Sequence, residues 1–409
     1  MVLKDLGWFI LKDNPVMNLW VKYCVSFEAL DSKRLESFMR FSSKNAFYTN
    51  HRVEFIDKED VRSGFSELTG TYKYPCTTGF TSGTTNAPLK LKRSVKSIIY
   101  DEACLKKHWY EQGAPLMPKI ATLRGDLLPK DNIDKSEFWL DMSLTRRLIM
   151  SSFHLSPSNI KYYLKKLDTY KPDIILAYPS AVKTFTRLAK VHGWRPHANF
   201  IGVFTSGEFF SKNDQALVKE VFGKVFDHYG QAERVARLQQ CSYGKYHVKQ
   251  GYAHVEFSPV DCKYEIIGTS YRNRAMPLVK YRSGDFISKL PNNALCRCGL
   301  TSPYVEEIEG REGGVLVSAS GKEFPFAGLS RVVYGINNLE ESQYVQTSVN
   351  TLLIRYSTLN SATSPDIEDE IGSSILNMLG DEFVISFQYM DVIPRNKSGK
   401  LSAVVVDYE

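Results

Sequence analysis

The chain lacks the signals of a membrane or secreted protein. No apolar run approaches the roughly 20 residues that a membrane-spanning helix needs. The N-terminal stretch MVLKDLGWFILKDNP breaks its short apolar patch with Lys12 and has no signal-peptide cleavage site. Cysteine is sparse, since the 409 residues include 7, an odd number scattered along the chain. Such usage is typical of reduced thiols and not of a disulfide framework. We therefore expect a cytoplasmic protein without a transmembrane segment.

Extremes of charge and the common nucleic-acid motifs are missing as well. The formal net charge is +7 and is spread along the chain, and the hydrophobic content of 43% is ordinary for a globular protein. No zinc-finger pair, RNA-recognition motif or helix-turn-helix signature is present, so we expect no nucleic-acid partner. The length exceeds what one hydrophobic core usually serves, which predicts more than one domain.

The sequence has no G-x-x-x-x-G-K-[ST] loop, the usual signature for nucleotide phosphates. It has instead the stretch Thr78–Lys90, TGFTSGTTNAPLK, in which hydroxyl side chains surround two glycines. Glycines allow tight turns that expose consecutive N–H groups, and hydroxyls add donors at short range. Such a loop fits a polyanion such as a nucleoside triphosphate. An isolated stretch of this kind is equally often a plain surface turn.

Four further segments favour the phosphate-binding interpretation. They follow in order as Tyr229–Glu233 (YGQAE), Tyr281–Asp285 (YRSGD), Gly310–Gly314 (GREGG) and Ile393–Lys400 (IPRNKSGK). The ordered set resembles the adenylate-forming superfamily of acyl- and aryl-CoA ligases. Within it, the chain is similar to the phenylacetate–CoA ligase branch and its shorter, CapK-like relatives from capsular polysaccharide clusters. The resemblance runs from about Tyr74 to the C-terminus.

The resemblance implies a fold, a reaction and a set of site residues. The implied reaction joins a carboxylate to the α-phosphate of ATP. In the family pattern Glu233 holds Mg²⁺, Asp285 accepts hydrogen bonds from the ribose hydroxyls, and Lys400 bridges the acyl carboxylate and the α-phosphate. The residues implied to be catalytic are Lys400 and Glu233. The residues expected to bind the nucleotide are Thr81, Ser82, Gly83, Thr84, Thr85, Glu208, Tyr229, Gly230, Asp285 and Arg311.

Two positions depart from the family pattern. The loop usually continues with Gly-Lys-Pro, whereas Asn86–Ala87–Pro88 stands here, so one cationic contact to the pyrophosphate is missing. Lys90 and Lys92 are candidate substitutes. The second departure is Ala232, which replaces a common Thr next to Glu233 and alters a contact to the α-phosphate or the acyl group.

Strand and helix patterns alternate between residues 156 and 228, which predicts βαβ units and a parallel sheet. We expect strands at 173–178, 200–205 and 224–228, with helices at 156–167, 179–192 and 211–222. A β-rich region follows, with strands at 264–267, 278–281 and 286–290. The predicted fold is α/β: a large N-terminal adenylation domain (1–310) and a small mobile α+β lid domain (311–409), joined at the glycine-rich segment 310–314. The lid is expected to contain strands at 315–318 and 384–390, two strands split near Asn350, and helices at 326–334 and 366–379.

A second predicted site is a structural zinc centre. Cys241 and His247 lie close in sequence, and Cys296 and Cys298 form a C-R-C-G motif further along. Three thiols and an imidazole suit closed tetrahedral zinc, and phenylacetate–CoA ligase-like relatives have similar positions. The alternative is four unconnected, part-buried residues.

The leading hypothesis is an AMP-forming ligase that passes the acyl group to CoA or to an amine, for example on a sugar of a surface polysaccharide. Its partners would be a small carboxylic acid, ATP and an acyl acceptor. Two alternatives stay open, an adenylyltransferase that stops at AMP transfer and a catalytically silent nucleotide-binding scaffold. The acid pocket is expected around 178–180, 203–207 and 228–232, where Arg124 and His154 are candidates to meet a polar or anionic acid. No CoA-specific signature is present, and residues 1–70 carry no assignable function.

Overall fold

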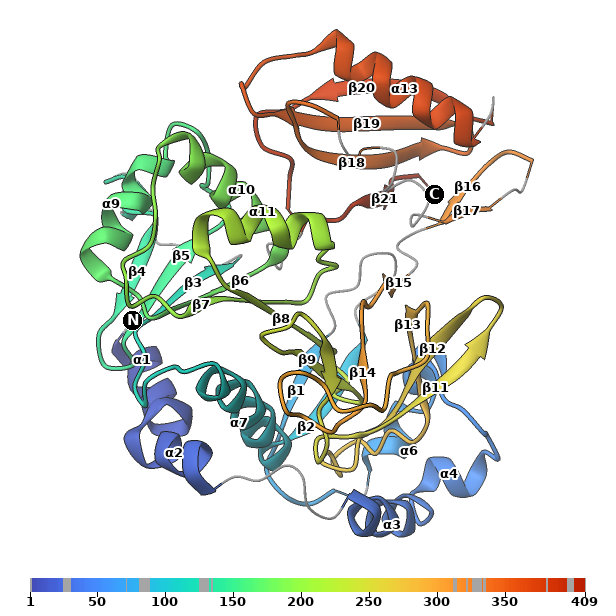
Figure 1. Ribbon diagram of the computed structural model, residues 1–409. Helices are drawn as coiled ribbons and strands as arrows, with labels where there is room; N and C mark the ends of the chain where they lie inside the picture. Colours follow the sequence, from blue (N-terminus) through green and yellow to red (C-terminus); the bar gives the residue numbers. More distant parts are fainter. Residues whose placement is uncertain are drawn as a thin grey trace.

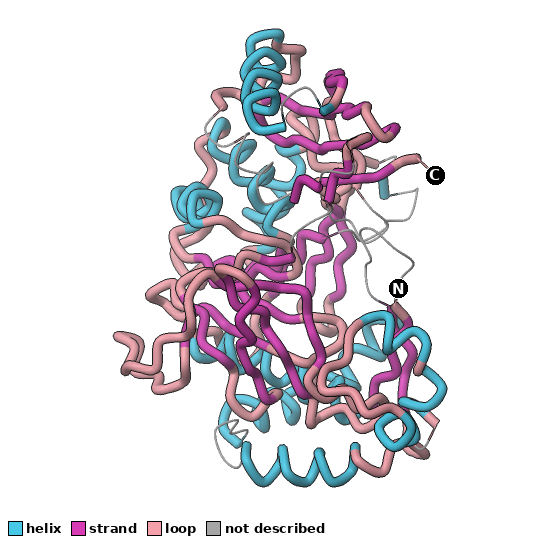
Figure 2. Tube along the Cα trace, turned by 90° about the vertical axis from the view of Figure 1, so that its right-hand side faces the viewer, coloured by secondary structure: helices cyan, strands magenta, loops and turns pink. Residues whose placement is uncertain are grey.

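The computed structural model describes residues 2–24, 31–70, 72–80, 89–124, 132–133, 135–311, 315–320, 323–325, 333, 336–379, 382–395 and 401–408. A large body carries the long sheet, and a smaller unit, which contains a separate sheet and the helix Pro365–Leu379, stands above it in both ribbon and tube views (Figures 1 and 2). The expected phosphate loop Thr81–Thr85, Lys400 and most of the expected helix at 326–334 lie outside the described residues.

The body is built on a nine-stranded sheet with the order β14-β10-β9-β8-β7-β6-β3-β5-β4. The five strands from β8 to β5 in this order are parallel, and antiparallel strands extend both ends. The parallel strands are β3 (Ile120–Arg124), β5 (Arg147–Ser151), β6 (Ile174–Ala177), β7 (Gly202–Ser206) and β8 (Val225–Gly230). The antiparallel strands are β4 (Trp139–Met142), β9 (Arg237–Gln240), β10 (Tyr246–Val248) and β14 (Tyr304–Val305). The predicted parallel α/β sheet is confirmed.

Successive side chains along each strand point to opposite faces of this sheet, so apolar side chains cover both faces. On β6, Ile175 and Ala177 pack with helices α9, α10 and α11, whereas Ile174 and Leu176 pack with Trp109 of α7 on the other face. A strand buried on both faces reads as a continuous apolar run, as β6 does. Each fully buried aliphatic side chain contributes about 1.5–3 kcal/mol relative to exposure. The helices are α7 (Val95–Glu111), α9 (Ile160–Tyr170), α10 (Pro179–Val191) and α11 (Lys212–Phe222).

A second, four-stranded sheet and a hairpin complete the body. The sheet has the order β11-β12-β13-β15, with β11 (His254–Val260), β12 (Lys263–Thr269), β13 (Tyr281–Ile287) and β15 (Gly310–Arg311). The hairpin pairs β1 (Cys76–Phe80) with β2 (Lys90–Ser94) and so brackets the glycine-rich loop. The strand expected at 278–281 is wrong for most of its length. Val279 donates its backbone N–H to the Tyr48 hydroxyl, and Lys280 adopts a left-handed conformation (φ 46°), so β13 begins only at Tyr281.

The C-terminal unit has its own hydrophobic core. Its sheet has the order β20-β19-β18-β21, and helix α13 packs Ile367, Ile371 and Ile375 into the same core as Ile354 and Tyr356 of β19. The elements are β16 (Val315–Val317), β17 (Glu323–Pro325), β18 (Leu339–Ser348), β19 (Thr351–Thr358), α13 (Pro365–Leu379), β20 (Val384–Tyr389) and β21 (Val404–Val406). A domain boundary at residue 310 stays a prediction.

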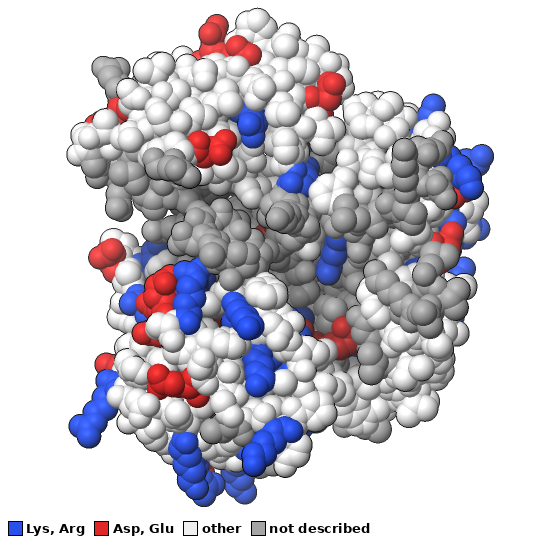
Figure 3. Space-filling model, turned by 180° about the vertical axis from the view of Figure 1, so that it is seen from behind, with Lys and Arg blue, Asp and Glu red and all other residues white. Residues whose placement is uncertain are grey.

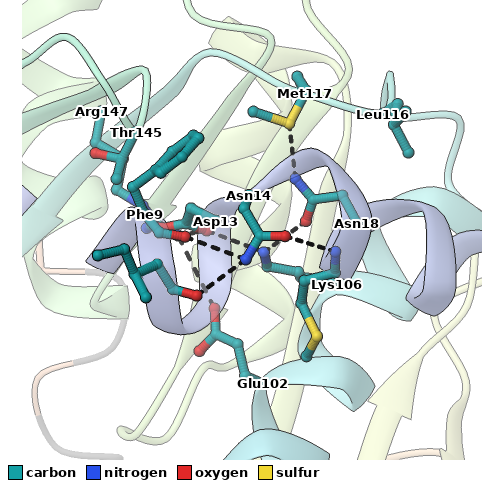
Figure 4. Close-up of polar contacts among 12 residues, drawn as sticks. Phe9, Asp13, Asn14, Asn18, Glu102, Lys106, Leu116, Met117, Thr145 and Arg147 are labelled. Carbon is teal, nitrogen blue, oxygen red and sulfur yellow. Dashed lines mark hydrogen bonds and ion pairs between the residues drawn. The ribbon is translucent and has the colours of Figure 1, made fainter. Parts of the chain in front are cut away.

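The N-terminal residues are helical and are tied to the body by a buried charge cluster. Asp13 pairs with Lys106 (2.9 Å) and Arg147 (3.0 Å), and Lys106 also donates to Asn18 (2.6 Å) (Figure 4). The helices here are α1 (Val2–Trp8), η1 (Phe9–Asp13), α2 (Pro15–Leu19), η2 (Trp20–Cys24), α3 (Asp31–Ser42), α4 (Ala46–Asn50), α5 (Lys58–Ser63) and α6 (Phe65–Thr69). Among the described helices, none is long and apolar enough to cross a membrane.

Candidate active site and metal centre

The carboxyl ends of the parallel strands meet at one edge of the large sheet, where α/β proteins bind ligands. The loop after β7 carries Glu208, whose carboxylate accepts hydrogen bonds from the backbone N–H (2.8 Å) and the hydroxyl (3.1 Å) of Ser180. Ser180 lies in the first turn of α10, where a carboxylate satisfies open N–H groups and is favoured by the helix dipole. Glu208 therefore joins the loops that follow β6 and β7.

Two motifs far apart in the sequence meet beside this edge. The Tyr229 hydroxyl donates to Asp285 Oδ2 at 2.6 Å, and the Gln231 amide contacts both groups. The Tyr281 hydroxyl donates to Glu233 Oε1 at 3.1 Å. Each motif thus supplies a tyrosine that holds the acidic residue of the other, which fixes both carboxylates in place.

Glu233 is the acidic residue whose surroundings fit a cation. Its side chain is 2% exposed, and its Oε2 atom is buried without a hydrogen-bond partner among the described residues. A buried carboxylate oxygen without a partner costs free energy unless a ligand satisfies it. Carboxylate oxygen together with phosphate oxygens is a ligand set that Mg²⁺ prefers. Glu233 therefore fits the magnesium role expected for it.

Asp285 lies where strand pairing brings two further motif positions together. The antiparallel register of β13 and β15 pairs Asp285 with Arg311 and Phe286 with Gly310. The Arg311 backbone is therefore next to Asp285, while its side chain lies outside the described residues. Gly284 in the same motif has φ +70°, a conformation that favours glycine. The YRSGD motif is thus a strand with a glycine-dependent irregularity that presents Asp285.

The last motif approaches the same edge from the C-terminal unit. Arg395 of IPRNKSGK bonds both carboxylate oxygens of Glu341 on β18 (2.6 and 2.8 Å), and Glu208 is among the charges that stabilise its cation. Thr184 of α10 donates to Glu341 across the boundary (3.3 Å). Seen from behind, the surface is hollowed between the C-terminal unit and the body, with Lys, Arg, Asp and Glu intermixed on that face (Figure 3). The segment that precedes Lys400 thus starts close to the loop of Glu208.

The expected acid pocket is lined by polar groups from neighbouring strands. The Arg124 guanidinium at the end of β3 lies 5.3 Å from the Tyr178 ring centroid and donates to the Ser206 hydroxyl at 3.4 Å. His228 on β8 has a pKa well below its ordinary value because it is buried and lies near Arg237, His108 and Arg124. His154 stacks on Phe138, with ring centroids 5.4 Å apart, and burial lowers its pKa. A neutral His228 and a cationic Arg124 suit an acid with a second polar or anionic group.

The four residues predicted for zinc come together in space. One ligand atom each from Cys241, His247, Cys296 and Cys298 lies within 4.8 Å of all the others. Cys241 and Cys296 each begin a tight turn. The Gly244 N–H donates to the Cys241 carbonyl, and the Gly299 N–H donates to the Cys296 carbonyl, both at 2.9 Å. These glycines have φ of +74° and +86°. The alternative of four unconnected residues is wrong as a description of the geometry.

The hydrogen bond that His247 makes on its far side favours metal binding by this cluster. His247 Nδ1 lies 3.0 Å from the Ser302 carbonyl, which only accepts, so Nδ1 carries the proton and Nε2 offers its lone pair to the cluster. Burial raises the pKa of the Cys298 thiol to about 12. Burial acts the same way on Cys296, but hydrogen bonds from Cys298 outweigh it and lower the pKa of the Cys296 thiol. Cys298 is therefore a thiol at neutral pH in the metal-free cluster, and binding of a cation such as zinc would release its proton, since the thiolate is the ligand.

Comparison with known proteins agrees with this geometry. Residues 316–407 match the family model described as the CapK C-terminal domain. This C-terminal part of the chain therefore resembles CapK. Protein CapK of Staphylococcus aureus is 20% identical over 406 residues, which cover 93% of this chain and 89% of the relative. The resemblance to CapK-like proteins that the sequence suggested is thereby confirmed.

Solved structures show that the CapK-like chain has the fold of AMP-forming ligases. A 2-hydroxyisobutyryl-CoA ligase in its postadenylation state, with a bound acyl-adenylate, superposes with a TM-score of 0.64 at 18% identity, covering 92% of this chain and 88% of that one. An open conformation of the same enzyme, with acyl-adenylate and CoA, gives 0.53 at 16% identity, covering 91% and 90%. Both conformations of that enzyme therefore share the fold of this chain.

Several polar residues of the CapK-like site were not predicted. Gln231 and Tyr281 stand inside the quoted motifs, and Ser180 stands inside the predicted acid pocket, but their partners become visible only in the fold. Outside the metal cluster, Cys104 is buried, whereas Cys262 is exposed at the turn between β11 and β12. The nucleotide-binding roles of the predicted residues stay predictions.

Proposed function

We propose that this CapK-like chain is an AMP-forming ligase. It converts a carboxylic acid and ATP into an acyl-adenylate and pyrophosphate, and it then passes the acyl group to a thiol or amine acceptor. The observation that supports this most directly is the pair of hydrogen bonds between the YGQAE and YRSGD motifs, from Tyr229 to Asp285 and from Tyr281 to Glu233. With these bonds, Asp285 would serve the ribose hydroxyls and Glu233 would serve a phosphate-bound cation.

The residues divide the work of the first half-reaction. A carboxylate oxygen of the acid attacks the α-phosphorus, an acyl–O–P bond forms, and the bond to the β-phosphate oxygen breaks with pyrophosphate as leaving group. Asp285 would orient the nucleotide through its ribose, while Arg124 and Tyr178 would line the acid side. Magnesium, when held by Glu233, would neutralise charge on the phosphates. Lys400 would stabilise the transition state between carboxylate and α-phosphate.

The second half-reaction would follow from movement of the C-terminal unit. The chain superposes with a postadenylation and with an open structure of one ligase, which supports a C-terminal unit that changes position between stages. The ligase in those structures binds CoA, which favours a thiol acceptor here. The resemblance of the sequence motifs to CapK-like proteins from capsular polysaccharide clusters favours instead an acceptor in surface polysaccharide formation, such as an amino sugar. We keep both acceptors and give zinc a structural role only.

The test is ATP–pyrophosphate exchange against a panel of aryl, fatty, hydroxy, dicarboxylic and amino acids. The proposal predicts acid-dependent exchange with at least one class. Exchange with none would favour the silent scaffold, and AMP transfer to a hydroxyl without acyl transfer would favour an adenylyltransferase. Product mass after addition of CoA or an amino sugar then identifies the acceptor.

Lys400→Ala adds a test of the two-stage mechanism. It should slow exchange by about 10²–10³-fold, because one positioned charge is lost from the transition state. Acyl transfer from a supplied acyl-adenylate should be spared. Equal losses in both steps would contradict the assigned role of Lys400.

A further inference from the structure

The loop that follows β1 lacks the lysine of the family pattern, and the two lysines considered as substitutes point elsewhere. Lys92 Nζ donates to the Thr69 carbonyl of α6 at 3.3 Å. Lys90 Nζ lies 4.9 Å from the ring centroid of Phe65, also on α6. Alternate residues of a strand share a face, so both lysines lie on the side of β2 that is turned to α6. Neither of them is directed at Glu233.

The opposite face of β2 carries a different cation, Arg93. Its Nε donates to the Ala232 carbonyl at 3.1 Å, next to Glu233. Its guanidinium lies over Gly79 of β1, so close that a Cβ at Gly79 would be 2.5 Å from Nη1. Gly79 stands just ahead of the Thr81–Thr85 loop, and Arg93 therefore spans from the start of this loop to the magnesium-binding motif.

The charges around Arg93 leave room for an anion. The neighbouring charged groups are Asp101, Glu233, Arg234 and Arg237, so three guanidinium groups face two carboxylates. Arg234 and Arg237 both pair with Asp101, at 3.3 and 2.6 Å. Burial and the nearby Arg234 lower the pKa of Arg93, and the attraction of Asp101 and Glu233 only partly compensates. Among the described residues, Arg93 forms one hydrogen bond, through Nε.

We propose that the Arg93 guanidinium binds the β- and γ-phosphates of ATP and so replaces the missing loop lysine. This assignment rests on the proposed ligase function. Its planar fork of N–H donors suits phosphate oxygens. The guanidinium would act on the pyrophosphate part, since it lies at Gly79, just ahead of the loop, and at the Ala232 carbonyl, next to Glu233. Arg93 then favours ATP over AMP and stabilises pyrophosphate as it leaves.

Two substitutions test this role from different directions. Arg93→Gln keeps a donor for the Ala232 carbonyl and removes the charge. Gly79→Ala keeps Arg93 and adds a methyl group where Nη1 now lies, and only the end of a flexible side chain has to move. Lys92→Gln is the matched control, because it removes a positive charge from the neighbouring position on the opposite face of the strand.

The experiment measures binding of Mg·ATP, inorganic pyrophosphate and AMP by calorimetry, with the thermal midpoint of each variant. Arg93→Gln should weaken ATP and pyrophosphate by about 10- to 100-fold, as for a lost charge-assisted hydrogen bond. AMP affinity should change less than about twofold. Gly79→Ala should show the same selective loss to a smaller extent, and Lys92→Gln should resemble the wild type.

The outcomes separate this inference from the function on which it rests. The role of Arg93 would be overturned if ATP affinity were unchanged in both variants, or if the affinities for ATP and AMP fell by the same factor. Nucleotide binding by the wild type would in that case still be consistent with the proposed ligase function. If Arg93→Gln does not fold, the role of Arg93 is decided by Gly79→Ala alone, from whether its affinity for ATP falls while its affinity for AMP does not. Failure of the wild type to bind either nucleotide would instead refute the proposed function.

Discussion

The buried Asp13 cluster allows a stability prediction whose size follows from its geometry. Asp13, Lys106 and Arg147 are 4%, 1% and 5% exposed, and the carboxylate bonds both cations (Figure 4). Burial alone would raise the pKa of Asp13, but Arg147 and Lys106 outweigh it, so the pKa is lowered and the group is ionised at neutral pH. Asp13→Asn keeps the shape and removes the charge, which leaves two buried cations with Glu102 as the remaining nearby carboxylate at 3.9 Å from Arg147.

Breaking a buried pair by removing one partner costs about 3–5 kcal/mol. Asp13→Asn should therefore lower the free energy of unfolding by about that amount, measured from urea midpoints at neutral pH. The loss should shrink as the pH falls through the lowered pKa, because the wild type then loses its own charge. Limited proteolysis should also cut the segment before α3 faster, since Asp13 ties that segment to the body.

The matched control is an exposed pair of similar length. Lys190 and Glu220 are 2.6 Å apart and more than half exposed, so Glu220→Gln should cost less than about 1 kcal/mol. A cost for Asp13→Asn no larger than that of Glu220→Gln would refute the reasoning, because it would mean that the buried charges are solvated or can pair elsewhere.

Three further outcomes are expected. Purified protein without a histidine tag should contain about one zinc per chain, and Cys296→Ser should lower metal content and stability together while exposed Cys262→Ser changes neither. Burial and the nearby Glu341 raise the pKa of Glu340 from 4.5 to about 7, so the folded state loses stability relative to the unfolded state as the pH rises toward and through that value. The thermal midpoint of Glu340→Gln should therefore exceed that of the wild type by more at about pH 8 than at about pH 6. An equal difference in midpoint at both pH values would contradict this. Arg124→Ala should lower kcat/KM about tenfold for dicarboxylic or hydroxy acids and little for apolar acids, as competition assays can show.

The part of the fold that the sequence predicts is the part in which proline and glycine mark the ends of helices and strands. Pro179, Gly193 and Gly223 separate short apolar runs from amphipathic helices, and the βαβ units from β6 to β8 follow directly. Strands β3 and β5 escape this pattern because the antiparallel β4 comes between them along the chain, and β5 pairs with β4 on one side and parallel with β3 on the other. The N-terminal helices escape it too, because the bond between Arg147 and Asp13 joins positions 134 residues apart.

The same division holds for the candidate site. Glu233 and Asp285 stand in ordered motifs, and Cys296 and Cys298 stand close to each other in sequence, so they could be selected without coordinates. Arg93 could not be separated from Lys92 by residue type, because both are cations on one short strand. Only the pairing of β2 with β1 decides which of the two faces Gly79 and which faces α6.

The contact between α10 and the C-terminal sheet argues for the predicted movement of that unit. The hydrogen bonds described there are polar: Thr184 donates to Glu341, and Arg187 donates to the Glu340 carbonyl. Groups of this kind exchange their partners for water at small net cost when an interface opens. Glu340 adds a buried Oε1 atom that has no partner among the described residues, which makes the closed state less favourable still. Arg395 bonds Glu341 within the C-terminal unit, so a movement of that unit as a whole would keep this contact.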